Sequence, residues 1–412
     1  MSYKLLINIG QLVGVSSTQN PLRGNDLKNL SIIENAWLLV ENDRIHSFGS
    51  MQQMTVVVKP EQVIDINQQT ILPTWVDSHT HLVFAESREA EFVQKIQGAT
   101  YAEIAASGGG ILNSASKIAQ IDEEELYERS QIRLNELIKL GTGAIEIKSG
   151  YGLSTEAELK MLRVIKRLKE VNDIPIKATF LGAHAYPLKF KENHSAYIDL
   201  IIHEMLPEIE RLKLADYMDV FCEKGFFEIE ESRRLLNAGL KHGLVPKIHA
   251  NQLNCFGAVE LGVELGAVSV DHLESMDDAS IKTLGGSTTI GTLLPGAAYF
   301  LRMSYPPARD LINAGAVLAL ASDFNPGSCP SGNMNQMVSM ACIQMKLLPS
   351  EAINAATING AFAMGVHQEV GSIAVGKKAN LILYAKMPSL SYIPYSFGSN
   401  LIEAVMISGS FI

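Results

Sequence analysis

The chain has little cysteine, little positive charge and no long apolar run. Its four cysteines, among 412 residues, form no CxxC pair, which excludes a zinc ribbon, a thioredoxin motif and a disulfide-built miniprotein. So few thiols suit a reducing compartment. No apolar run approaches the roughly 18–20 residues of a membrane helix, and the N-terminus lacks the basic and apolar regions of a signal peptide. We therefore expect a cytoplasmic protein with no membrane partner.

The charge balance and the composition narrow the class further. With 34 basic against 44 acidic residues the net charge is −10, which argues against nucleic acid as a partner. A content of 47% hydrophobic and 19% charged residues is that of an ordinary globular chain and excludes disorder and collagen. Because 412 residues exceed what one core usually serves, we expect two domains, or one large α/β barrel with an added unit.

Both ends of the chain are rich in short β-like runs, separated near the N-terminus by a polar loop at 20–29. The predicted strands lie in 4–9, 36–40, 44–49, 371–386 and 401–412. We predict that residues 1–70 and 366–412 form one small β-sandwich domain, with a larger domain of residues 71–365 inserted between them.

The middle of the chain alternates strand-like and helix-like segments. Eight strands are predicted, at 74–81, 143–150, 176–184, 217–223, 245–251, 267–273, 288–295 and 317–324. A helix is predicted over 154–172, capped by Ser154 or Thr155, and another over 230–243. This alternation predicts a (β/α)8 TIM-type barrel, whose site is built at the carboxyl ends of the strands.

Five of the ten histidines fall at those strand ends: His79, His81, His184, His249 and His272. The other five, which look like surface residues, are His46, His194, His203, His242 and His367. The last predicted strand ends in Asp323. Neutral imidazoles with one carboxylate suit Zn²⁺ or iron.

The His79-Thr-His81 triplet is the strongest local signal, because side chains at i and i+2 of a strand share a face and can reach one ion. Together with His249 and Asp323 it predicts a metal site. Two plainer interpretations stay open: His249 could be a hydrogen-bonded core histidine, and Asp323 a helix N-cap.

This pattern of strand-end residues resembles the amidohydrolase superfamily over the whole barrel. The resemblance implies one Zn²⁺ or Fe³⁺ per subunit, bound by His79, His81, His249 and Asp323. Lys224 is the only lysine near the place where binuclear members carry a bridging carboxylated lysine. We interpret the site as mononuclear.

Longer motifs narrow the resemblance to the imidazolonepropionases, a family within that superfamily. These motifs are FAESREAEF (84–92), GATYAEIAASGGGI (98–111), EIKSGYGL (146–153), TFLGAHAYP (179–187) and SDFNPGS (322–328). The resemblance implies hydrolytic opening of 4-imidazolone-5-propanoate to N-formimidoyl-L-glutamate in L-histidine degradation. It also suggests a homodimer.

The substrate of that reaction carries a propanoate group, which Arg88 could bind through its guanidinium. The plainer interpretations are a solvated loop arginine for Arg88 and an ordinary loop aromatic for Tyr151. The residues that the resemblance assigns to substrate or product are Arg88, Tyr151, His184, Gln252, Asn325, Gly327 and Ser328.

The expected chemistry uses a metal-activated water that attacks the ring carbonyl. His272 would polarise the developing oxyanion, and Asp323 would pass the water's proton to the leaving nitrogen. Gln252 stands where some family members carry a glutamate base. Glutamine cannot titrate, so Gln252 enters the catalytic set as a hydrogen-bond partner of the ring, and the base is Asp323 or His272.

Two other functions stay open at this point: a heterocycle deaminase with the same metal ligands, and a non-catalytic barrel scaffold. An uncharged heterocycle offers no carboxylate to Arg88. This favours hydrolysis of 4-imidazolone-5-propanoate over deamination of a heterocycle. The Gly108-Gly109-Gly110 run is not followed by Gly-Lys-Ser/Thr, so we expect a loop over the barrel mouth and not a phosphate loop.

Overall fold

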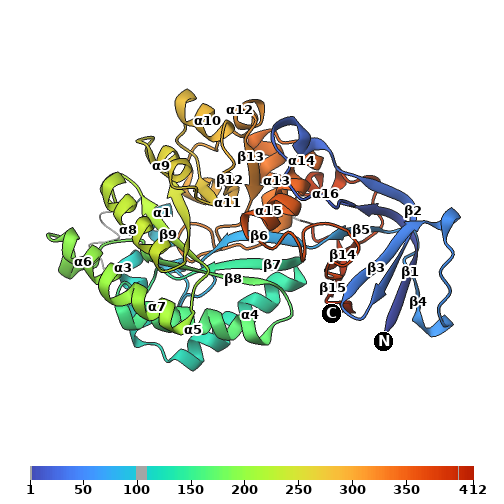
Figure 1. The fold of residues 1–412 in the computed structure, drawn as a ribbon, viewed down its shortest axis with the longest axis horizontal. Helices are drawn as coiled ribbons and strands as arrows, with labels where there is room; N and C mark the ends of the chain where they lie inside the picture. The colour runs from blue at the N-terminus through green and yellow to red at the C-terminus, as the bar shows by residue number, and fades with distance from the viewer. Residues whose placement is uncertain (1, 99–108, 398) are drawn as a thin grey trace.

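The computed structural model describes residues 2–98, 109–397 and 399–412. It consists of a barrel and a separate β-sheet beside it (Figure 1). Residues 99–108, which include Gly108 of the glycine run predicted to lie over the barrel mouth, are outside the described residues.

Eight parallel strands form the barrel, in the order β13-β12-β11-β10-β9-β8-β7-β6. They are β6 (Trp75–Thr80), β7 (Thr142–Lys148), β8 (Ile176–Ala183), β9 (Tyr217–Cys222), β10 (Val245–Ala250), β11 (Ser269–His272), β12 (Ile290–Leu293) and β13 (Val317–Leu320). All eight match predicted segments. Strands β6, β7 and β9 are buried along their whole length, as expected for parallel strands covered on both faces.

The barrel closes between its first and last strands, beside two of the predicted metal ligands. The His81 amide donates to the Phe324 carbonyl at 2.9 Å, and the Asp323 amide donates to the His79 carbonyl at 3.0 Å. The backbone therefore fixes the spacing between the histidine pair and Asp323.

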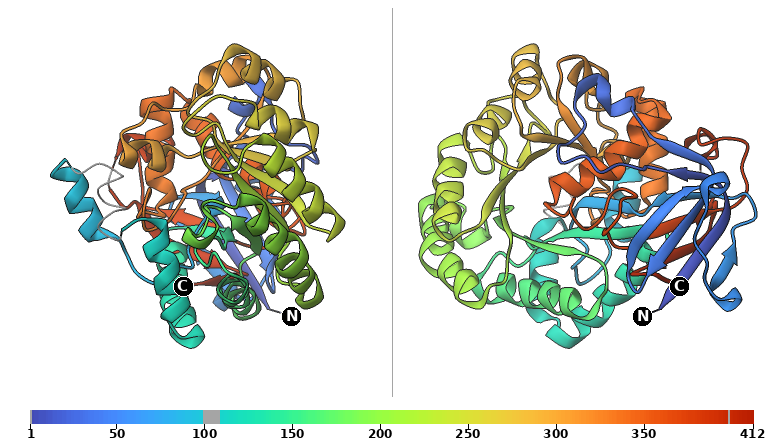
Figure 2. Two further views of the ribbon diagram at one scale, coloured as in Figure 1. Left: turned by 90° about the vertical axis from the view of Figure 1, so that its left-hand side faces the viewer. Right: turned by 45° about the vertical axis from the view of Figure 1, so that its right-hand side comes forward.

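Helices surround the barrel (Figure 2). They are α1 (Glu89–Ile96), α3 (Ile111–Gln120), α4 (Glu123–Lys139), α5 (Thr155–Val171), α6 (His194–Leu200), α7 (Leu206–Leu212), α8 (Ile229–Lys241), α9 (Ala258–Glu264), α10 (Asp278–Gly285), α11 (Pro295–Leu301), α12 (Ala308–Asn313), α13 (Met334–Met345), α14 (Pro349–Ala356), α15 (Ile358–Ala363) and α16 (Tyr392–Tyr395). Within the described residues, no helix combines the length and the hydropathy needed to cross a bilayer.

The two helices predicted from the sequence are present as α5 and α8. The expected capping of α5 is wrong in detail: Ser154 holds the cap position, but its side chain makes no capping hydrogen bond. At the other helix the chain turns at Gly243, whose φ of +77° favours glycine.

The second sheet joins both ends of the chain. Its strands are β1 (Tyr3–Val13), β2 (Ile32–Glu41), β3 (Arg44–Ser50), β4 (Val63–Asp65), β5 (Thr70–Pro73), β14 (Leu381–Tyr384), β15 (Ile402–Ile407) and β16 (Ser410–Phe411). Strand β5 pairs with both β1 and β14, and so links the N-terminal strands to the C-terminal ones. The predicted barrel with a β unit drawn from both termini is confirmed.

Two local predictions in this sheet are wrong. The segment 371–386 forms one short strand, at Leu381–Tyr384. The polar loop at 20–29 contains a short 3-10 helix, Gly24–Lys28, in which Leu27 is buried. The division into residues 1–70 with 366–412, and 71–365, stays a proposal.

Asn335 joins the two sheets. Its side-chain oxygen accepts from Trp75 Nε1 of the barrel at 3.2 Å and from the Tyr384 hydroxyl of the second sheet at 2.8 Å. Trp75 and Tyr384 are almost completely buried, so neither donor has water as an alternative partner.

We expect Asn335→Leu to destabilise the protein by about 2 kcal/mol, because it leaves two buried donors without an acceptor. Urea unfolding followed by tryptophan fluorescence measures the loss. The matched control is Asn135→Leu on the exposed face of α4, which should change stability by less than about 0.5 kcal/mol. Equal stability of the two variants would contradict this role of Asn335.

Candidate active site

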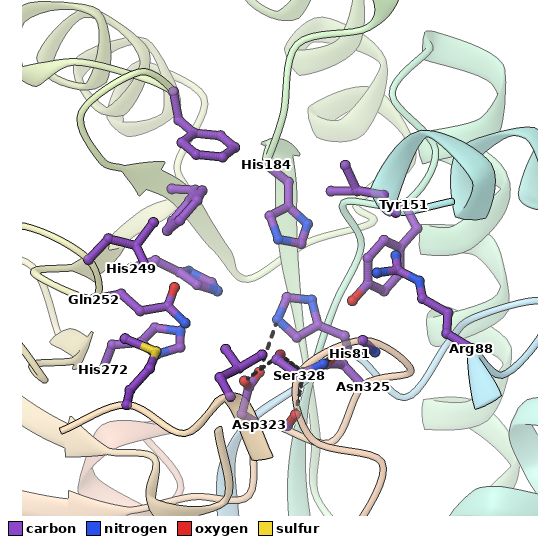
Figure 3. Close-up of a pocket in the computed structure, with 18 of the residues that line it drawn as sticks. His81, Arg88, Tyr151, His184, His249, Gln252, His272, Asp323, Asn325 and Ser328 are labelled. Atoms are coloured by element: carbon purple, nitrogen blue, oxygen red, sulfur yellow. Dashed lines mark hydrogen bonds and ion pairs between the residues drawn. The ribbon is translucent and has the colours of Figure 1, made fainter. Parts of the chain in front are cut away.

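A cavity of about 530 Å³ opens at the carboxyl end of the barrel strands. Figure 3 shows labelled side chains from several strands and loops pointing into it. The predicted site residues that line it are His81, Arg88, Tyr151, His184, His249, Gln252, His272, Asp323, Asn325, Gly327 and Ser328. Every predicted site residue except His79 therefore lines the cavity; His79 is fully buried beside it.

The predicted metal ligands form two overlapping groups. One nitrogen from each of His79, His81 and His249 lies within 4.8 Å of the others, and His79 forms a second such group with His272 and Asp323. The Asp323 Oδ1 atom lies 3.6 Å from His79 Nε2 and 3.5 Å from His81 Nε2. The four predicted ligands thus surround one point at the end of β6.

The chemistry of these donors fits a metal ion. The Nε2 atoms of His79 and His249 are buried and have no hydrogen-bond partner among the described residues, a costly state unless a ligand satisfies them. The pKa values of His79 and His81 lie well below their ordinary value. Burial is the main cause for both rings. The positive charge of Lys148 comes next for His79, and neighbouring imidazoles lower the pKa of both rings further. Neutral imidazoles are the form that binds metals.

Buried carboxylates hold the other nitrogens of two ligands. The Nδ1 atom of His79 lies 2.7 Å from Asp271 Oδ2, and the Nδ1 atom of His249 lies 2.9 Å from Asp219 Oδ2. Such partners fix the ring orientation and leave the Nε2 lone pair free for the metal. The sequence analysis did not identify either aspartate.

A cluster of fully buried charges lies beneath these carboxylates. The Lys148 Nζ atom lies 2.8 Å from Glu146, 2.9 Å from Asp219 and 3.8 Å from Asp271. The Lys247 Nζ atom lies 3.8 Å from Glu146 and from Asp271. The sequence contains one indication of this charge cluster. Glu146 and Lys148 stand at i and i+2 of an apolar strand, so both side chains must lie on the same face.

His272 lies beside another carboxylate that was not predicted from the sequence, Glu274. Its Nδ1 atom is 3.4 Å from Glu274 Oε1. Burial lowers the pKa of His272, but Glu274, Asp323 and Asp271 more than offset this, so the pKa of His272 is raised overall. The backbone at His272 (φ +87°) and Asp323 (φ +55°) is in the left-handed region, a strained conformation that is common at functional sites.

Glu158 holds the turn that carries Tyr151. Its buried carboxylate accepts from the backbone amides of Gly150, Gly152 and Leu153 at 3.0, 2.7 and 2.9 Å. Tyr151, which this turn carries, is buried as well, and burial raises the pKa of its phenol, which therefore stays neutral. Glu158, in the first turn of α5, thus stabilises the turn that precedes the helix.

His184 also depends on that turn, since its Nδ1 donates to the Gly150 carbonyl at 3.1 Å. Burial, with the neighbouring His249, lowers the pKa of His184 to about 3. A neutral ring with Nδ1–H leaves Nε2 as an acceptor. His184 can therefore accept a hydrogen bond from a ligand N–H group.

Arg88 lies across the cavity from Gln252 and His272 (Figure 3). Its Nε and Nη2 atoms donate to Ser114 Oγ at 2.9 and 2.8 Å, and its guanidinium lies 5.6 Å from the centre of the Tyr151 ring. Serine fixes the guanidinium without neutralising it, so the positive charge remains available to a ligand.

Asn325 organises the loop after β13. Its Oδ1 accepts from the amides of Gly327 and Ser328 at 2.8 and 2.7 Å, and its Nδ2 donates to the Asp323 carbonyl at 2.6 Å. The Ser328 hydroxyl in turn donates to Asp323 Oδ2 at 3.1 Å. Asn325 thus positions Asp323 and Ser328, and its predicted contact with product stays a prediction.

Lys224 is exposed and does not line the cavity, in keeping with the mononuclear interpretation. Of the five histidines expected at the surface, none lines the cavity. Two charged cavity residues were not identified from the sequence: Glu91 and Lys95, both on α1.

Three imidazoles and a carboxylate at the carboxyl ends of barrel strands define the site of a metal-dependent hydrolase. The model of the amidohydrolase family matches residues 70–412. Imidazolonepropionases of Flavobacterium johnsoniae and Christiangramia forsetii are 55% and 53% identical, each over 99% of this chain and 99% of the relative. The chain belongs to the imidazolonepropionase family of amidohydrolases.

Solved structures agree with the fold. A guanine deaminase from E. coli matches with a TM-score of 0.75 at 13% identity, covering 100% of this chain and 99% of that one. A guanine deaminase from C. acetobutylicum, with bound guanine, matches with a TM-score of 0.72 at 16% identity, covering 100% of both chains. At these identities the likeness concerns the fold alone.

We expect His249→Ala to lose most of its bound metal, because it removes one of three clustered imidazoles. Elemental analysis of gently purified protein measures the metal-to-protein ratio. His203→Ala is the matched control, because His203 is exposed and outside the cavity. A His249 variant with full metal occupancy would remove this residue from the ligand set.

Proposed function

We propose that the protein hydrolyses 4-imidazolone-5-propanoate to N-formimidoyl-L-glutamate, with one metal held by His79, His81, His249 and Asp323. The observation that carries the proposal is a single cavity with metal-ligand imidazoles on one side and the Arg88 guanidinium on the other. A substrate with a hydrolysable ring and a carboxylate on a short chain fits both ends.

Arg88 binds the propanoate group in this proposal. Its Nη1 atom makes no hydrogen bond within the described part of the chain, while Nε and Nη2 are held by Ser114. The neutral Tyr151 phenol is placed to add a hydrogen bond to the same carboxylate. An uncharged heterocycle would leave Arg88 as an unpaired cation in a partly enclosed cavity, which disfavours a deaminase.

The metal, when bound, lowers the pKa of a coordinated water toward neutrality and so supplies the nucleophile. His272, whose pKa its carboxylate neighbours raise, donates to the ring carbonyl oxygen as negative charge develops there. Gln252 cannot titrate and hydrogen-bonds the ring, and His184 accepts from a ring N–H. These contacts orient the ring without taking part in proton transfer.

Asp323 is the proton carrier. Burial raises its pKa above the ordinary value, against the opposing effect of His272 and His249. A carboxylate with a raised pKa can take the proton of the attacking water and release it to the ring nitrogen as the carbon–nitrogen bond breaks. The Ser328 hydrogen bond holds the second oxygen of Asp323 during this transfer.

Three finer features belong to the same proposal. The metal is Zn²⁺ or Fe³⁺, since three imidazoles and a carboxylate suit both ions. The protein is a homodimer located in the cytoplasm. Elemental analysis distinguishes the metals, and sedimentation velocity measures the oligomeric state.

We expect the purified protein to consume 4-imidazolone-5-propanoate, and a chelator to abolish the activity. Ultraviolet absorbance of the imidazolone ring follows the reaction, and added metal should restore it. Purine and pyrimidine substrates tested in parallel provide the contrast. If the metal-loaded protein deaminates one of these and leaves the imidazolone untouched, the proposed function is wrong.

We expect Arg88→Ala to lower kcat/KM by about 10- to 100-fold, mostly through KM, because it removes a charge-assisted contact to a remote part of the substrate. The metal content should not change. Arg211→Ala, on an exposed face of α7, should retain wild-type kinetics. Loss of metal in the Arg88 variant would indicate that Arg88 maintains the site instead of binding substrate.

A further inference from the structure

Lys95 lines the cavity, although neither the motifs nor the proposed function uses it. It lies on α1, seven residues after Arg88, which immediately precedes that helix. Residues seven apart share a helical face, and Glu91 lies between them on the same face. All three side chains line the cavity.

The charges on this face do not cancel. The Glu91 carboxylate accepts from the Gly110 amide at 2.8 Å, and no carboxylate in the described residues lies within ion-pair distance of Lys95 Nζ. The one hydrogen bond that Lys95 Nζ makes there is to the Gly327 carbonyl, at 3.4 Å. Within the described residues, two of its three N–H groups are therefore uncommitted, and Arg88, Glu91 and Lys95 leave a net charge of +1.

Burial lowers the pKa of the Lys95 ammonium, Glu91 opposes this, and the Arg88 charge adds to the lowering. The two cations therefore repel each other. An anion bound between them would relieve that repulsion.

Arg88 and Lys95 converge on Gly327. A Cβ atom at Gly327 would lie 2.4 Å from Arg88 Nη1, and the carbonyl of the same residue accepts from Lys95. The absence of a side chain at Gly327 lets the guanidinium approach the backbone. The uncommitted N–H groups of both cations are thus near one residue.

We propose that Lys95 is a second carboxylate-binding residue, which together with Arg88 clamps the propanoate group of the substrate beside Gly327. This inference rests on the proposed function and extends it. One carboxylate neutralises the net charge of +1. The new carboxylate of the product forms at the metal end of the cavity, so the clamp holds the chain carboxylate before and after ring opening.

The first test is kinetic. We expect Lys95→Met to lower kcat/KM for 4-imidazolone-5-propanoate by about tenfold, mainly through KM. Lys95→Arg should stay within about threefold of wild type, because it keeps the charge. Lys117→Met on the neighbouring α3 is the matched control. It removes an exposed ion pair with Glu86 and should not change the kinetics.

The second test separates a carboxylate contact from a role in holding the loop. Imidazole-4-propanoate and 4-propylimidazole differ in the carboxylate, and their inhibition constants or calorimetric Kd values are measured on wild type and Lys95→Met. We expect the variant to bind the propanoate about tenfold more weakly and the propyl compound equally well. Equal losses for both, or no loss for the propanoate, would overturn the inference.

These outcomes are distinguishable from failure of the proposed function. If wild type binds imidazole-4-propanoate but opens no imidazolone ring, the proposed reaction is wrong. The two-cation clamp is then still tested by comparing how wild type and Lys95→Met bind the propanoate and the propyl compound. If wild type opens the ring and Lys95→Met is unaffected, the reaction stands and the clamp is wrong.

Discussion

The ammonium group of Lys148 lies among three carboxylates inside the barrel, and the metal site depends on this arrangement. Asp219 and Asp271, both fully buried, hold two of the predicted ligand imidazoles. Burial alone would lower the pKa of Lys148, but the three carboxylates raise it overall. Burial alone would raise the pKa of Asp219, but His249 and Lys148 lower it overall. With Lys247, two lysines face three carboxylates. The remaining negative charge beneath the histidines favours a cation above them.

The two sides of the cavity are built differently. The metal side uses strand ends, whose positions the barrel hydrogen bonds fix, and two buried aspartates on strands, Asp219 and Asp271, orient the imidazoles. The substrate side uses loops, and each loop depends on one buried polar side chain: Glu158 for the turn around Tyr151, and Asn325 for the turn that carries Ser328. A loop held by three or four hydrogen bonds to one side chain can be as rigid as a strand end, so binding groups on loops can still be preorganised.

The parts of the fold with a repeating pattern could be predicted from the sequence, because buried parallel strands are short apolar runs and the His-Thr-His triplet marks the end of one. The supporting groups could not. Asp219 and Asp271 lie on different strands, and nothing in one sequence indicates that both face the same interior. Lys95 lies seven residues from Arg88, a spacing that indicates a shared face only when the intervening residues are known to be helical. The strand expected over 371–386 is cut short, because the residues before Leu381 form only isolated bridges, Ile373 with Val15 and Lys378 with Arg44, instead of a continuous ladder.

The net charge of −10 does not show that charge is distributed unevenly around the cavity. Negative charge lies beneath the metal ligands, and positive charge lies at Arg88 and Lys95. On the proposed function this separation determines which way round the substrate binds. A free carboxylate is itself a good metal ligand, so a propanoate group that reached the histidines would compete with the reacting carbonyl. The cations around Gly327 hold the carboxylate at the other side, and the ring is then the part of the substrate that faces the metal.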